Sequence, residues 1–165
     1  MIMLDFITSK IAMMIAAVII LTSVLGIFAW QREDSKALEL RNIADEISNS
    51  INEFNSISGE TKVNVTFEKS NEGIYLNPKV DGEDYEIIIT QSEVIVRQND
   101  RLFLRNFISS VHIWEPNSEF YDKDEIKDND SKSPQQELRS GEDFQIYRKL
   151  VNSGEGKQYM TFVYT

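Results

Sequence analysis

The chain contains no cysteine, a single histidine and only three prolines among its 165 residues. Without cysteine it has no disulfides, zinc–thiolate sites or thiol nucleophiles, although this absence does not identify the redox compartment. With one histidine it lacks a histidine metal cage, and nothing in the composition indicates a catalytic triad. Basic side chains are outnumbered, 17 against 27 acidic, and the formal charge of -10 disfavours nucleic acid as a partner.

One long stretch near the amino terminus has no charge at all. As a helix, the residues from Ile11 to Trp30 would rise about 30 Å, the thickness of a hydrocarbon core, and Lys10 and Arg32 flank them. The sequence therefore predicts a short tail at residues 1–10 and a transmembrane helix at residues 11–30. A cleaved secretory signal and a buried soluble helix are the alternatives. The length of the run disfavours both, and no small-x-small cleavage site follows it.

The orientation of the span does not follow from its flanking charges, because Lys10 on one side faces three basic residues on the other. Only ten residues precede the span, too few for a domain, so we expect the larger carboxyl-terminal part to be translocated. Asn64 and Asn129 begin Asn-x-Ser/Thr sequons and are candidates for N-glycosylation. The expected location is the cell surface, with the domain extracytoplasmic and tethered to the membrane.

A helical repeat of apolar residues continues past the span and predicts an amphipathic helix at residues 31–58. Apolar or small residues at alternating spacings of three and four form one stripe along both segments, and only Glu33 interrupts it. We call this stripe the seam. Its residues are Ala12, Ala16, Ile19, Ser23, Gly26, Trp30, Leu40, Ala44, Ile47, Ile51 and Phe54. Small residues dominate it in lipid, where close backbone approach drives association, and large ones dominate it in water. The seam therefore predicts lateral assembly.

Two alternatives to this long assembling helix remain open. The aqueous half of the seam, after Leu40, would pack only on the chain's own sheet. Asp34 or Ser35 would cap a separate second helix, because both residue types favour the N-cap position.

Beyond Gly59 the apolar period changes from helical to two, which is typical of strands. The alternating runs predict strands at residues 63–67, 74–76, 85–90, 94–97, 102–107 and 111–114, with a turn at residues 71–73. A closing hairpin is predicted at residues 144–151 and 158–164. The expected fold is α+β: a long N-terminal helix, transmembrane and then amphipathic, packed on an antiparallel β-sheet domain at residues 59–165.

The segment 115–143 holds ten acidic and four basic residues, and its polarity predicts a mobile acidic loop. Its candidate calcium ligands are Asp122, Asp124, Asp128 and Asp130. An EF-hand loop starting at Asp122 would require glycine where Lys127 stands, so the sequence favours a solvated loop without a metal ion.

No pattern in the sequence indicates catalysis or a cofactor. His112 lies in a predicted strand between Val111 and Ile113, where a structural imidazole is more common than a catalytic one. Aromatic residues recur at strand spacing and are expected in the core. They are Phe103, Phe107, Trp114, Tyr147, Tyr159, Phe162 and Tyr164. We therefore expect a protein that is not an enzyme.

The layout of short tail, apolar span, amphipathic helix and strand-rich end resembles the type IV pilin-like proteins of archaea. At the residue level the resemblance rests on three segments: Arg41-Asn-Ile-Ala-Asp-Glu-Ile47, Val111-His-Ile-Trp-Glu-Pro116 and Tyr159-Met-Thr-Phe-Val-Tyr164. It implies a non-enzymatic, membrane-anchored structural subunit that assembles through its long helix, with further copies or pilin-like subunits as partners. A membrane-anchored binding module that does not self-assemble is the alternative.

Two features depart from the pilin pattern. Thr8-Ser9-Lys10 stands where pilin precursors carry basic residues followed by a small one, and no acidic residue lies inside the span. The resemblance therefore does not imply cleavage by a pilin peptidase, and both a filament subunit and an uncleaved accessory protein agree with it.

Overall fold

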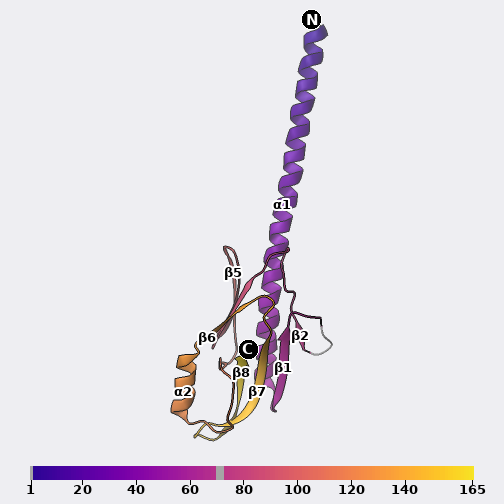
Figure 1. Cartoon of the computed structure of the whole chain (residues 1–165). Coiled ribbons are helices and arrows are strands. Elements are labelled where there is room, and N and C mark those ends of the chain that lie inside the picture. Colours follow the sequence, from indigo (N-terminus) through magenta and orange to yellow (C-terminus); the bar gives the residue numbers. More distant parts are fainter. Residues whose placement is uncertain (1, 70–72) are drawn as a thin grey trace. The chain divides into compact units, whose positions relative to one another are not determined.

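The computed structural model describes residues 2–69 and 73–165, with side chains from residue 9 onward (Figure 1). The chain divides into two compact units, Met1–Leu38 and Glu39–Thr165. Helix α1 is assigned over Ile2–Ser56, so the last part of this helix belongs to the second unit. The backbone is helical at Asp34 and Ser35, and neither residue caps a separate helix. The predicted α+β architecture is confirmed.

The first unit consists of the apolar part of α1. Its hydroxyl side chains bond to carbonyls one turn earlier: Thr22 Oγ1 donates to Val18 O at 2.8 Å and Ser23 Oγ donates to Ile19 O at 2.8 Å. Such bonds satisfy a hydroxyl group without water. The segment is therefore compatible with lipid despite these two polar residues.

The second unit contains two four-stranded sheets. In the first, the strand order is β2-β1-β7-β8, built from β1 (Thr61–Thr66), β2 (Ile74–Tyr75), β7 (Phe144–Asn152) and β8 (Lys157–Tyr164). In the second, the order is β5-β4-β3-β6, built from β3 (Glu86–Thr90), β4 (Glu93–Gln98), β5 (Arg101–Asn106) and β6 (Gln135–Arg139). Neighbouring strands are antiparallel except for the parallel pair β1 and β2.

Most predicted strands are present, and one is not. The β3–β4–β5 meander and the β7–β8 hairpin are confirmed. Residues 111–114 are not a strand, because only His112 forms a bridge, a parallel one to Phe162 of β8. The predicted turn at residues 71–73 lies partly outside the described residues. At its end, Gly73 has a φ of +105°, and a Cβ there would lie 2.3 Å from Asn64 O, so the chain requires glycine.

One hydrophobic core joins the helical part of the second unit to both sheets. Alternate residues of the strands point inward, as Ile87 and Ile89 do in β3 and Val94 and Val96 do in β4. Leu40, Ile43, Ala44, Ile47 and Ile51 of α1 belong to the same cluster of buried side chains. The apolar stripe of the helix therefore faces its own domain, as expected for an amphipathic helix on a sheet.

A stripe of polar side chains beside this apolar stripe ties α1 to β5 and the loop after it. Asp45 pairs with Arg105, Ser48 Oγ donates to Asn106 O at 3.2 Å, and Asn52 Oδ1 accepts from Ile108 N at 2.8 Å. The spacing of these three residues and Asn55 is three or four, so they share one helix face. Asn55 Nδ2 donates to Ser109 O at 3.3 Å.

The prediction of a mobile acidic loop at residues 115–143 is wrong. The segment forms helix α2 (Lys123–Lys132) and strand β6, which pairs with β3. Asp122 caps α2 by accepting from Asp124 N and Glu125 N, and Glu125 Oε2 accepts from Asp122 N at 2.9 Å. This reciprocal capping box places the acidic charge at the amino end of the helix dipole, where it is stabilising.

Candidate functional site

The predicted assembly seam divides into two chemically different halves. In the second unit, Leu40, Ala44, Ile47 and Ile51 are each at most 1% exposed, and Phe54 packs against the same core. These residues are therefore not available to a neighbouring subunit, and their assignment to an assembly surface is corrected to a core-packing role. These residues agree with the alternative, in which the part of the seam after Leu40 packs on the chain's own sheet. The periodicity is the same for both roles, so the sequence did not separate them.

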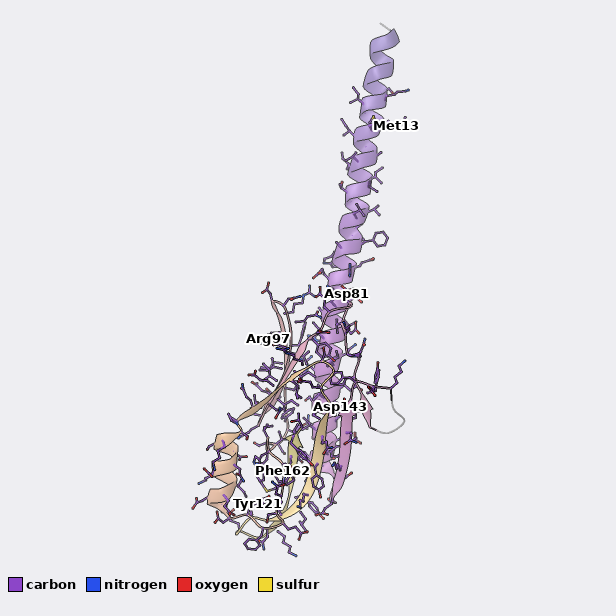
Figure 2. The ribbon with its side chains drawn as sticks, in the orientation of Figure 1. Met13, Asp81, Arg97, Tyr121, Asp143 and Phe162 are labelled. Carbon is purple, nitrogen blue, oxygen red and sulfur yellow. The ribbon has the colours of Figure 1, made fainter. Side chains whose placement is uncertain are left out.

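The lipid half of the seam lies in the first unit, where the described apolar side chains are exposed. Large apolar residues from Ile11 to Trp30 are 41–71% exposed, and Met13 in Figure 2 is among the most exposed at 71%. The helix from Ser9 to Ser56 is long and apolar enough to cross a membrane. It is a candidate membrane anchor, because so many exposed apolar side chains are strongly unfavourable in water.

A polar junction at Asp130 joins α2 to the segment 112–114 of the second unit. His112 Nδ1 lies 2.8 Å from Asp130 Oδ1, and Trp114 Nε1 donates to the same oxygen at 2.9 Å. Burial raises the pKa of Asp130, but hydrogen bonds from His112 and Trp114 outweigh it and hold this pKa below its ordinary value.

The junction rests on an aromatic cluster that forms a second, smaller core. Trp114 contacts Phe162 edge-on at 4.9 Å between ring centroids and Tyr121 at 5.0 Å, and Ile126 of α2 packs against this cluster. Tyr121 and Phe162 are labelled in Figure 2. Edge-to-face rings at these distances are stabilising. The cluster confirms the expected core position of Trp114 and Phe162, and it explains why α2 is ordered despite its polar sequence.

The carboxylates considered for calcium have other partners. Asp122 caps α2, Asp128 Oδ2 accepts from Lys132 Nζ at 2.5 Å, and Asp130 binds His112 and Trp114. Among residues 2–69 and 73–165, no group of three or more His, Asp or Glu side chains is arranged to hold a metal ion. The four aspartates are therefore not brought together at a common point.

The two sequons lie in regular structure. Asn64 is exposed in β1, and Asn129 is half-buried in α2, where its carbonyl accepts from Ser133 N at 3.0 Å. Of the two, Asn64 is the more accessible, and glycosylation of both stays a prediction.

Arg148 is a functional candidate that the sequence reasoning missed. Its Nε donates to Ile57 O at 2.7 Å and its Nη1 donates to Thr161 Oγ1 at 2.9 Å. The last turn of α1 holds no basic residue, so this guanidinium, from a strand far away in sequence, supplies the positive charge that favours a helix carboxyl end. A signal was present: Arg148 follows Phe144 and Ile146 at strand period, and a charge at an inward position is unusual.

Two of the polar hollows on the second unit differ in the charges of their lining. One, of about 220 Å³, is lined by residues that include His112, Arg148 and Thr161. The other, of about 440 Å³, lies over β3, β4 and β6, where Arg97 donates to Glu86 within the lining. In the second hollow the opposite charges neutralise each other, whereas no carboxylate contributes to the lining of the first.

Comparison with known proteins gives no relative: no family model matches the chain, no curated protein resembles it in sequence, and no solved structure matches it.

Proposed function

We propose that the chain is a non-enzymatic, membrane-anchored structural subunit of the pilin-like class. The amino-terminal part of α1 anchors it and assembles laterally with other copies or with similar subunits, while the sheet domain is extracytoplasmic. The observation that carries the proposal is the contrast along α1. Its apolar stripe from Leu40 to Ile51 is buried in the core of the second unit, whereas the described apolar side chains from Ile11 to Trp30 are exposed.

The residue types on the lipid half of the seam support assembly. Ala12, Ala16, Ser23 and Gly26 recur on one side of the helix, and small residues allow the close backbone approach that drives helix association in lipid. A Cβ added at Gly26 would meet no atom within 4 Å. The glycine is therefore not required by the fold of the single chain, which agrees with a role between chains.

Bulky substitutions on the seam test the proposal. Ala16→Leu combined with Gly26→Leu should lower cross-linking between copies in membranes, because the added side chains separate the helix backbones. Ala17→Leu combined with Ala29→Leu is the matched control, since both alanines lie off the seam. We expect the control to cross-link like the original chain. Both variants should stay in the pellet after carbonate extraction, because the apolar length is unchanged.

Two results would count against the proposal. The first is an original chain that gives no cross-linked ladder in membranes, and the second is a ladder that the seam and control variants lower equally. An anchored binding module would then describe the protein better, and the hollow beside Arg148 is the observation in favour of that second candidate.

A further inference from the structure

The guanidinium of Arg148 has binding capacity that the fold does not use. Its bonds to Ile57 O, Thr161 Oγ1 and Asn55 Oδ1, the last at 3.5 Å, all come from Nε and Nη1. Within the described chain, Nη2 makes no hydrogen bond and no carboxylate forms an ion pair with Arg148. Its charge faces neutral oxygens and the ring of Tyr159, whose centroid lies 5.6 Å from the guanidinium carbon, and burial lowers its pKa.

The surroundings of Arg148 add further donors and no acid. Its side chain lines the hollow of about 220 Å³ together with His112, Ser109, Ser110 and Gln158. Asp130 accepts from Nδ1 of His112, so this ring nitrogen is not free to donate to a ligand. The hydroxyl and amide groups of the three other residues can donate. In a chain with a net charge of -10, an acid-free hollow around an arginine is unexpected for a purely structural surface.

We propose that this hollow binds an oxyanion, a carboxylate or phosphate group, through Arg148 with the neighbouring hydroxyl and amide groups as further donors. Arginine presents parallel N–H groups that match the oxygens of either group. The volume accommodates such a group but not a whole cofactor, because ligand sites for larger molecules are about 300–1,000 Å³. The site serves ligand capture by the exposed domain and does not depend on how the anchoring helices assemble.

The single histidine makes the site directly observable. The full chain, labelled with ¹⁵N only in histidine, is dissolved in an uncharged maltoside detergent at constant ionic strength and pH. It is then titrated with inorganic phosphate or with acetate in place of chloride. We expect the ring signals of His112 to shift and to saturate, with half-saturation below about 10 mM for the better anion. The phosphate and acetate arms decide which group the site prefers.

Three variants assign the shift to the hollow. Arg148→Gln should weaken binding at least tenfold, and Arg97→Gln, which removes the same charge from the other sheet, should leave it unchanged. Because Arg148→Gln also removes the donor to Ile57 O, a second variant keeps the arginine: Ser110→Leu adds bulk at an exposed position lining the hollow and should abolish the saturable shift. The proposal would be overturned if the His112 shift of the original chain did not saturate. It would also be overturned if Ser110→Leu or Arg148→Gln saturated at the same anion concentration as the original chain.

Discussion

Single polar side chains hold together segments of this domain that are remote in sequence. Asp130 receives two donors from residues 112 and 114, and Arg148 bonds to the carbonyl that follows α1. Neither role is visible in the sequence: Asp130 is one of ten acidic residues in its segment, and its partners lie in another part of the chain. The strand period places Arg148 on the inward face of β7, which is unusual for a charged residue, but it does not identify the groups that Arg148 bonds to.

Removal of the Asp130 carboxylate should destabilise the second unit. In Asp130→Ala, His112 and Trp114 lose a shared acceptor in a site where the His112 and Asp130 side chains are only 15% and 21% exposed. The expected loss is about 1–3 kcal/mol of unfolding free energy, measured by denaturant unfolding in detergent. Asp128→Ala is the control on the same helix, and its exposed pair with Lys132 predicts a change below about 0.5 kcal/mol. Equal losses would contradict the role of Asp130.

Because the fold lowers the pKa of Asp130, we expect the stability of the second unit to depend on pH. Because its folded pKa lies below the unfolded value of about 3.9, its contribution is complete well above pH 4 and is lost as the pH falls through the folded pKa. Asp130→Ala should therefore lose less stability than the original chain between about pH 5 and pH 3. Parallel pH profiles would show that Asp130 is not held in its charged form by the fold.

At the scale of elements, the predictions from sequence were correct where the apolar residues that set the period are also the buried ones. The spacing of Leu40, Ala44 and Ile47 predicted a helix face, and this face is buried in the domain. The prediction for the acidic segment was wrong because it was based on composition and overlooked a local capping signal. Asp122 and Glu125 have the spacing of a capping box, and β6 carries only one apolar residue, Leu138, so no alternation marked that strand.

Because the acidic segment forms α2 and covers the aromatic cluster, we expect it to be required for stability. Replacement of residues 119–136 by a short Gly-Ser linker removes Tyr121, α2 and the first residues of β6, and uncovers Trp114 and Phe162. We expect a loss of about 3 kcal/mol or more, measured by thermal or denaturant unfolding. Asp124→Asn with Lys127→Gln, exposed changes that leave the segment in place, should alter stability little. A deletion that unfolds like the original chain would restore the loop interpretation.

At the scale of the whole molecule, the two units differ in whether their apolar side chains are buried within the chain. The second unit buries its own in a core shared by the last part of α1 and both sheets, whereas the described apolar residues from Ile11 to Trp30 are exposed. The sequence predicted this candidate anchor from length and absence of charge alone. It did not separate a lipid-facing surface from an assembly surface, since both are apolar.

A disulfide scan of the apolar helix in membranes tests the proposed assembly most directly, and the natural absence of cysteine makes each introduced thiol unique. Single cysteines at seam positions Ala12, Ala16, Ser23 and Gly26 are compared with cysteines at Met14, Leu21 and Phe28, which lie on the opposite side of the helix. The account predicts oxidised dimers at the seam positions and few at the opposite positions, because only seam backbones approach closely enough for a disulfide. Equal dimer yields on both sides, or none at any position, would contradict assembly through this helix.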